Sequence, residues 1–273
     1  MNFSLIATDN VIRVLWDVRH WVIQTFSLTG NAASFVVIGA AMLCIILPYL
    51  IGSINPAILI STLFYRDDIR KHGSGNAGTT NMLRTFGVKA AVLTLLLDFS
   101  KAVVATLLGR LLFGVWGQAI AGFFVGFGHM FPIYYRFRGG KGVACFGIVA
   151  LVIHPFAFLV ILGTFLIVLI GTRFVSLASV MAAIMYPMAF HWAAILTKTA
   201  DDNGANMLMA FLAACFVVFM HRENLKRIWN NTESKIDFSK FKKKKKVKAT
   251  AQTKSDAPVE PSQSDSKKEQ DNE

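Results

Sequence analysis

Long apolar segments make up most of this chain, and they restrict the folds that it can adopt. A helix needs about 20 apolar residues to cross the hydrocarbon core of a bilayer. Five segments reach or approach that length: residues 34–64, 88–109, 111–128, 174–196 and 205–221. Hydrophobic residues make up 54% of the 273 positions and charged residues only 16%, unlike an ordinary soluble domain. The sequence therefore predicts an all-α integral membrane protein.

A sixth apolar segment, residues 143–172, is divided by His154 and Pro155. Loop charges indicate how often it crosses, because lysine and arginine gather in cytoplasmic loops. The basic segments are residues 66–89, 136–141 and 222–248. A chain that leaves the cytoplasm after Lys141 and returns at Arg222 crosses an even number of times, so the sixth segment contributes two crossings or none. We expect a short hairpin, and with it about seven transmembrane helices, the N-terminus outside and the C-terminus in the cytoplasm.

The chain is expected to have three parts. Residues 1–32 should form an amphipathic extension at the membrane interface, because apolar residues recur there at helical spacing beside two tryptophans. Residues 33–237 should form the multi-span membrane domain. Residues 238–273 should form a basic and then disordered cytoplasmic tail. Its lysine run favours an anionic membrane surface, and nothing else in the chain points to nucleic acid, so we expect no nucleic-acid partner.

A polar, glycine-rich loop, Gly73–Asn81, follows the first span. Glycines let backbone N–H groups approach an anion closely. The hydroxyl and amide donors of the loop are Ser74, Asn76, Thr80 and Asn81. Arg84 adds a planar guanidinium that suits phosphate oxygens. A phosphate site and a polar turn that caps the next helix are both consistent with this loop alone.

A second glycine-rich stretch comprises Gly139, Gly140, Lys141 and Gly142, at the start of an apolar helix. It lacks the spacing of a nucleotide-binding P-loop. Three glycines around one lysine before a helix N-terminus nevertheless suit an anion. The alternative is a lysine that only marks the cytoplasmic boundary of the membrane.

Other polar residues stand at or within the spans. His221 and Asn224 lie one helical turn apart and could together orient a hydroxyl or a phosphate, or simply cap the helix at the interface. Asp98 and Lys101 should pair inside the bundle, because an unpaired charge is costly in lipid. His129 is expected to be a packing or interface residue.

Several catalytic devices are missing from the sequence, namely a nucleophile elbow, a metal-ligand cluster and an inward carboxylate pair. We therefore expect no cofactor and no metal. A reaction at this site should use an already activated donor such as an acyl phosphate, which needs only positioning and charge stabilisation.

Four blocks of the sequence resemble the bacterial acyl-phosphate:glycerol-3-phosphate acyltransferases of the PlsY type. The blocks are Gly52–Pro56, Asp68–Asn81, Gly128–Ala144 and His221–Ile236. The resemblance runs from about residue 40 to 237 and implies acyl transfer from acyl phosphate to the first hydroxyl of glycerol 3-phosphate, forming lysophosphatidic acid for phospholipid biosynthesis. It also implies a seven-span fold in the cell membrane with a site that faces the cytoplasm, and a soluble enzyme that supplies the acyl phosphate.

The resemblance also implies roles for individual residues. Ser74, Thr80 and Arg84 would hold the substrate phosphate or hydroxyl, and Asn76 and Asn81 would also bind substrate. Lys141 and its glycines would bind phosphoryl groups, His221 and Asn224 would complete the catalytic set with Ser74 and Lys141, and Ser179 is a further candidate. Direct attack by the acceptor hydroxyl, with the donor phosphate taking the proton, is favoured over an acyl-Ser74 intermediate.

The chain departs from the family pattern at Thr79, Ala102 and Cys145, where Ala, Gly and Thr are usual. These departures concern the surroundings of the site. The alternative from another class is a membrane transporter of an organic phosphate, which would bind its substrate at mid-membrane depth.

Overall fold

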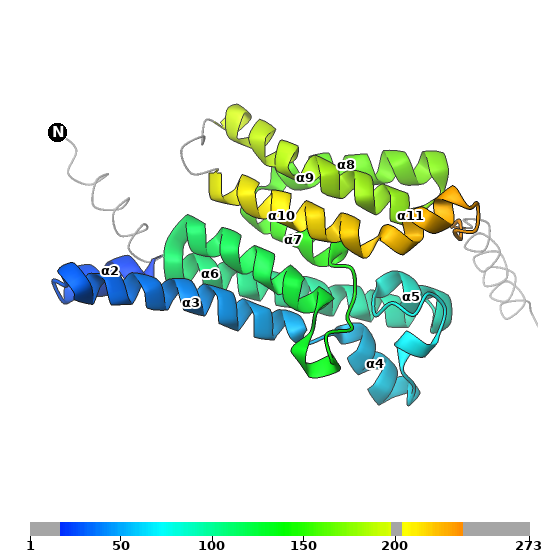
Figure 1. Ribbon diagram of the computed structural model, residues 1–273, viewed down its shortest axis with the longest axis horizontal. Helices are drawn as coiled ribbons and strands as arrows, with labels where there is room; N and C mark the ends of the chain where they lie inside the picture. The colour runs from blue at the N-terminus through cyan, green and yellow to red at the C-terminus, as the bar shows by residue number, and fades with distance from the viewer. Residues whose placement is uncertain (1–16, 198–203, 237–273) are drawn as a thin grey trace, which may run out of the picture. The chain divides into compact units, whose positions relative to one another are not determined.

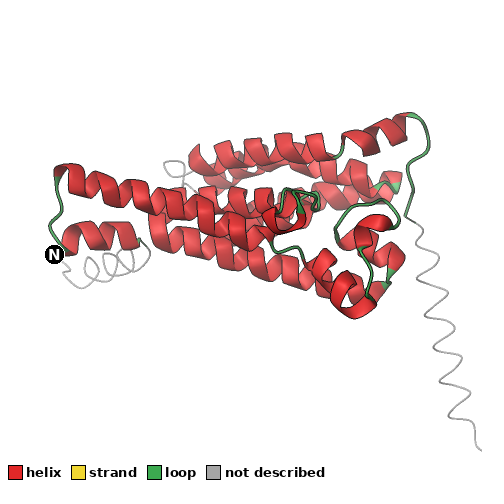
Figure 2. Ribbon diagram, turned by 60° about the horizontal axis from the view of Figure 1, so that its bottom comes forward, coloured by secondary structure: helices red, strands yellow, loops and turns green. Residues whose placement is uncertain are grey.

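The computed structural model describes residues 17–197 and 204–236, and the regular structure in these ranges is entirely helical (Figure 2). Most of the expected extension, residues 1–16, and residues 237–273 of the expected tail lie outside the described residues. Residues up to Ser234 form one unit, and those from Lys235 onward form another. The α-helices are α2 (Val18–Thr25), α3 (Gly30–Ser53), α4 (Pro56–Tyr65), α5 (Thr79–Thr85), α6 (Val88–Met130), α7 (Val143–Ile153), α8 (Pro155–Thr172), α9 (Val175–Thr197), α10 (Gly204–Met220) and α11 (Arg222–Trp229).

Several helices have the length and composition of membrane spans. In the described ranges, four segments qualify: Gly30–Tyr65, Val88–Tyr135, Pro155–Thr172 and Val175–Thr197. Helices α10 and α11 make a fifth if they are counted together across their bend of 52°. Apolar side chains cover the outer faces, and Phe35 on α3 and Ile167 on α8 are 73% and 74% exposed. Such exposure suits lipid rather than water.

Helix α6 is divided near its middle. Phe113 and Gly114 depart from helical geometry, and Gly114 has a φ of +61°, a conformation that favours glycine. The second half then packs against the first, since a Cβ atom added to Gly109 would collide with Gly117 and Ala121. The break lies a few residues beyond the division expected from hydropathy.

Two other breaks occur at prolines, as the sequence predicts. Pro56 begins α4 and Pro155 begins α8, because proline lacks the N–H that a first helical turn leaves unpaired. Asn55 caps α4 by accepting a hydrogen bond from Ile58 N at 3.2 Å. The segment 143–172 is thus two helices, with α7 only 11 residues long.

Small residues let the helices approach closely, which is the usual basis of packing in membranes. Gly52 on α3 lies against the Val125 backbone, and Gly128 on α6 lies against the Tyr49 backbone. The interface among α6, α7, α9 and α10 is built largely from alanines and aromatic rings.

The helix ends separate into two groups. Helices α5 and α11 lie at one end of the bundle and α2 lies at the other (Figure 1). The α6 break belongs to the α2 end, because the Arg19 guanidinium lies 4.3 Å from the centre of the Phe113 ring. Both glycine-rich loops connect helix ends on the α5 side, next to the start of α11.

Candidate active site

A cavity of about 860 Å³ lies between the two glycine-rich loops and helices α6 to α11. Ten of the twelve residues predicted for the site line it: Ser74, Asn76, Thr80, Asn81, Arg84, Lys141, Gly142, Ser179, His221 and Asn224. The other two, Gly139 and Gly140, do not line it. The interior of the cavity is apolar, with side chains from α8, α9 and α10. The fold therefore brings the two loops, about 60 residues apart in sequence, to one polar entrance above an apolar interior.

Asn81 shapes the first loop from within. It is buried, and its side-chain oxygen accepts a hydrogen bond from Ser74 N at 3.1 Å. Its amide nitrogen donates to the carbonyl oxygens of Ile69, His72 and Asn76 at 3.2, 2.9 and 3.0 Å. Because the loop engages both ends of this amide, Asn81 is placed to hold the loop in shape.

Arg70 connects the two loops. Its guanidinium forms hydrogen bonds of 2.8 to 3.1 Å with the Asp68 carboxylate, and these bonds lower the pKa of Asp68. The same guanidinium donates to the carbonyl oxygens of Tyr135 and Arg138 at 3.1 and 3.4 Å. The arginine thereby fixes the position of one loop against the other.

The second loop lies directly on His129. Gly140 N donates to His129 O at 3.0 Å, and Gly139 N donates to Met130 O at 3.2 Å. A Cβ atom on Gly140 would collide with the His129 ring and the Ala77 carbonyl of the first loop. Glycine at position 140 therefore allows His129 and both loops to meet at one point.

Lys141 is held by residues that follow α10. Its ammonium donates to the side-chain oxygen of Asn224, and the Asn224 amide nitrogen donates to Glu233 Oε1 at 2.7 Å. Ser176 also donates to Glu233 Oε1, at 2.8 Å, and Arg227 donates to Glu233 Oε2, at 2.7 Å. Burial acts to raise the pKa of Glu233, but these hydrogen bonds prevail and lower it.

The surroundings of Lys141 lower the pKa of its ammonium group. Burial lowers its pKa from 10.5 to about 8, and the positive charges of Arg227 and Arg84 act in the same direction. The Glu233 carboxylate opposes them and raises the pKa. Lys141 is thus an ammonium group at neutral pH, and a bound anion would stabilise its positive charge.

The tautomer of His221 follows from its contacts. Its Nδ1 lies 2.8 Å from the carbonyl oxygen of Val217, and a carbonyl can only accept, so Nδ1 carries the hydrogen. In the neutral ring, Nε2 is then left as an acceptor. Ser179, also on the cavity wall, donates its hydroxyl to Val175 O at 2.8 Å.

Three donors at the entrance remain available for a ligand. In the part of the chain that the structure describes, no hydrogen bond or ion pair engages the Ser74 hydroxyl, the Thr80 hydroxyl or the Arg84 guanidinium. Together with Lys141, they give the entrance an excess of donors and positive charge. Such a surface is suited to phosphate oxygens.

A buried cluster forms part of the cavity floor, because two of its members, Asp98 and His129, line the cavity. Lys101 Nζ lies 2.9 Å from both Asp98 Oδ1 and His129 Nδ1, and Asp98 and His129 lie 3.1 Å apart. His129, expected to be a packing or interface residue, thus also takes part in a buried polar cluster. Asp98, His129 and Cys145 could offer metal ligands, but the Lys101 ammonium already provides a cation among them. We assign this cluster to structural support.

Residues 42–231 match the family model described as glycerol-3-phosphate acyltransferase. This chain belongs to the glycerol-3-phosphate acyltransferase family. The glycerol-3-phosphate acyltransferase of Bacillus subtilis is 40% identical over 194 residues, which cover 71% of this chain and 96% of that protein. The one from Thermoanaerobacter pseudethanolicus is 37% identical over 198 residues, which cover 72% and 96%.

Solved structures agree with this family membership. PlsY (YgiH), an integral membrane glycerol 3-phosphate acyltransferase crystallised in its glycerol 3-phosphate form, has a TM-score of 0.63 and 32% identity, covering 74% of this chain and 98% of that chain. Its lysophosphatidic acid form has a TM-score of 0.62 at the same identity, with coverage of 72% and 95%. This glycerol-3-phosphate acyltransferase family member is therefore a multi-pass membrane acyltransferase.

Four residues of the site are not among those that the sequence predicted for it. Glu233 and Arg227 lie in one of the resembling blocks, but no role was expected for them. Nothing in the sequence distinguishes Ser176 as a site residue, because a serine near the start of an apolar helix is common. His129 could have been suspected from its place at the end of an apolar segment that precedes the second glycine loop.

Proposed function

We propose that this glycerol-3-phosphate acyltransferase moves a fatty acyl group from acyl phosphate to the sn-1 hydroxyl of glycerol 3-phosphate, forming lysophosphatidic acid and inorganic phosphate for phospholipid biosynthesis. One observation carries the proposal: Lys141, Arg84 and Arg227 line the polar entrance of a cavity whose interior is apolar. Both substrates have a phosphate group, and the donor also has a long apolar chain. The cavity is complementary to this pair.

The proposed binding roles follow from the available donors. The Ser74 and Thr80 hydroxyls and the Arg84 guanidinium, which have no partner among the described residues, hold the phosphate or the reacting hydroxyl of glycerol 3-phosphate. Lys141 binds the phosphoryl groups, with Gly142 exposing backbone beside it. Gly139 and Gly140 act indirectly, by allowing the loop to lie on His129. Asn76 and Asn81 act through the shape of the first loop.

The proposed chemistry needs no dedicated strong base. The acceptor hydroxyl oxygen attacks the carbonyl carbon of acyl phosphate, and the bond from that carbon to the phosphate oxygen breaks. The released phosphate takes the hydroxyl proton, so atoms and charge balance. Nε2 of His221 accepts a hydrogen bond from the hydroxyl and orients it, and Asn224 holds Lys141 toward the phosphate. Ser179 contributes a hydroxyl oxygen where the entrance meets the apolar interior.

A direct assay tests the reaction. Purified protein in detergent is given acyl phosphate and glycerol 3-phosphate, and lysophosphatidic acid is measured by mass spectrometry. We expect product from the unaltered chain, a loss of about 100-fold or more for Lys141→Ala, and little change for Lys89→Ala, an exposed lysine outside the cavity. Movement of glycerol 3-phosphate into vesicles without any product would favour the transporter instead.

Direct attack of the acceptor hydroxyl, without an acyl-Ser74 intermediate, can be tested separately. Rapid quenching with acyl phosphate alone, followed by peptide mass spectrometry, should reveal no acylated Ser74. An acylated Ser74 peptide that forms and decays at the rate of turnover would replace direct attack with a covalent intermediate.

We further propose seven crossings with the site on the cytoplasmic side. The seven are α3 with α4, the two halves of α6, and α7, α8, α9 and α10. The lysine-rich tail would then lie at the anionic inner surface, on the side where a soluble enzyme supplies acyl phosphate. Single cysteines introduced at Lys71 and Arg138 should react with an impermeant thiol reagent from the cytoplasmic side, and one at Asn31 should react from the outside. Labelling of Lys71 and Arg138 from opposite sides would contradict the arrangement.

A further inference from the structure

The large cavity ends at a wall that separates it from a second, smaller void. The small void has a volume of about 10 Å³, close to the room needed by one water molecule. Three residues line both spaces: Phe146 on α7, Tyr186 on α9 and Ala213 on α10. They are almost completely buried, at 4%, 5% and 1% exposure.

The two spaces are consecutive along the same helices. On α9 the large cavity is lined from Val175 to Tyr186, and the small void continues at Phe190, one turn further. On α10 the order is reversed, as expected for an antiparallel neighbour, with Val217 beside the large cavity and Asn206 beside the void. The lined stretch of α9 before the wall is about 16 Å long at 1.5 Å per residue.

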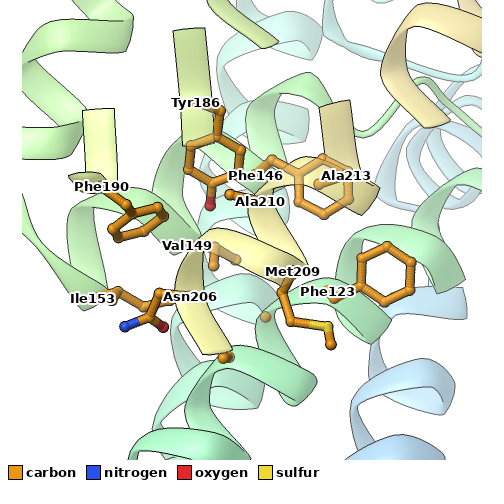
Figure 3. Close-up of a pocket in the computed structure, with 12 residues that line it drawn as sticks. Phe123, Phe146, Val149, Ile153, Tyr186, Phe190, Asn206, Met209, Ala210 and Ala213 are labelled. Atoms are coloured by element: carbon orange, nitrogen blue, oxygen red, sulfur yellow. The ribbon is translucent and has the colours of Figure 1, made fainter. Parts of the chain in front are cut away.

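The wall is rigidly built. The rings of Phe146 and Tyr186 have their centres 6.5 Å apart, and Tyr186 and Phe190 have theirs 5.3 Å apart. A Cβ atom on Gly126 would collide with the Phe146 ring, so α6 passes directly against it. In Figure 3 the Tyr186 ring stands beside Phe146, with its hydroxyl directed among the residues that line the void.

We infer that Phe146 and Tyr186 form the end wall of the acyl-chain site and set the longest acyl chain that the enzyme accepts, an inference that rests on the proposed acyl transfer. An acyl chain that enters from Lys141 runs along Ala182 and Ala183, whose small side chains leave it room, and its terminal methyl meets the Tyr186 ring. Longer chains are rejected because neither ring can move into the close-packed helices behind it. Without the Tyr186 ring, the space it leaves joins the void and accepts additional carbons.

A series of saturated acyl phosphates, from dodecanoyl to eicosanoyl, tests this wall with Tyr186→Ala. For each donor, kcat/KM is measured and divided by the value for dodecanoyl phosphate. The ratio for the longest donors should rise by about tenfold or more, since a few carbons in an apolar pocket change kcat/KM by that order. Phe124→Ala is the matched control: it removes an aromatic ring that packs against the same core but lines neither space, and it should leave the ratios unchanged.

A second variant acts in the opposite direction and does not depend on the folding of Tyr186→Ala. Ala183→Leu fills part of the interior before the wall, so the ratio for long donors should fall by a similar factor. If Tyr186→Ala and Ala183→Leu both transfer acyl groups with the ratios of the unaltered chain, the inference is wrong and the acyl chain leaves the site between helices. Absence of transfer with every donor in the unaltered chain would instead contradict the proposed function.

Discussion

The Lys101 ammonium donates a hydrogen bond to the carbonyl oxygen of Ile54 at 2.8 Å, where α3 ends and α4 begins. It also donates to Gly52 O at 3.1 Å and pairs with Asp98 at 2.9 Å. A helix that ends inside an apolar bundle leaves carbonyl groups without partners, and each is costly in that environment. Lys101 satisfies two of them, and through His129 it joins the break to the floor of the cavity.

Lys101→Met should therefore destabilise the protein strongly. The change removes the Lys101 ammonium from buried Asp98, leaving His129 as its remaining neighbour, and frees the carbonyls of Gly52 and Ile54. Removal of one member of a buried pair costs about 3–5 kcal/mol. Thermal unfolding of the purified protein in detergent measures the loss. The double variant Asp98→Asn/Lys101→Met should lose less than the two single variants together, whereas strictly additive losses would show that the pair is not coupled.

The activity should fall in alkaline solution. Because burial lowers the pKa of Lys141 to about 8, the lysine loses its proton as the pH rises through that value, and phosphate loses a cationic partner. We expect kcat/KM for glycerol 3-phosphate to decline above about pH 8, by about tenfold for each further pH unit. Lys141→Arg stays charged throughout and should lack this decline, even if its rate is lower. A decline of equal size and position in Lys141→Arg would assign it to another group.

Glu233 should set the pH at which the alkaline decline in kcat/KM begins. Its carboxylate raises the pKa of Lys141, and it also neutralises Arg227. In Glu233→Gln both effects are lost, so the pKa of Lys141 should fall and the decline in kcat/KM should start at a lower pH. Glu223→Gln, an exposed residue of α11, is the matched control and should leave the profile in place. A shift toward higher pH in Glu233→Gln would contradict this assignment.

Gly140→Ala should damage the site while sparing most of the fold. The new methyl group would collide with the His129 ring and the Ala77 carbonyl, so the two loops must separate. A displacement of about 1 Å at a reacting centre can cost about 100-fold in rate. The activity assay and thermal unfolding should be compared with Gly171→Ala on α8, where a Cβ atom has open space around it. Gly171→Ala should keep full activity; an equally active Gly140→Ala would remove the reason for a glycine there.

The sequence predicted the elements better than their contacts. The apolar segments, the breaks at Pro56 and Pro155, and the two glycine loops are local properties, because hydropathy, proline and glycine act over a few residues. The parity of the basic loops also predicts that both glycine loops lie on one side of the membrane. In contrast, the hydrogen bond between Lys141 and Asn224 joins residues 83 positions apart, and no local pattern records such a distance.

The role of several polar residues likewise depended on their neighbours. Asn81 looked like a ligand-binding amide, but the loop itself uses both ends of that amide. His129 looked like a packing residue, but it bonds to Lys101 and lies beneath Gly140. In each case the sequence shows which hydrogen bonds the side chain can form. It does not show which residue the side chain bonds to, and that partner determines its role.

The sequence by itself determined that this chain is a membrane protein with two glycine-rich loops, because hydrophobicity and glycine content act through local physics. Only the tertiary structure decided that these loops share one cavity, that Glu233 hydrogen-bonds the Asn224 amide that holds Lys141, and that Phe146 and Tyr186 line both the cavity and the void next to it. Those outcomes depend on the packing of helices that are distant in sequence, where a difference of one side chain opens or closes a space.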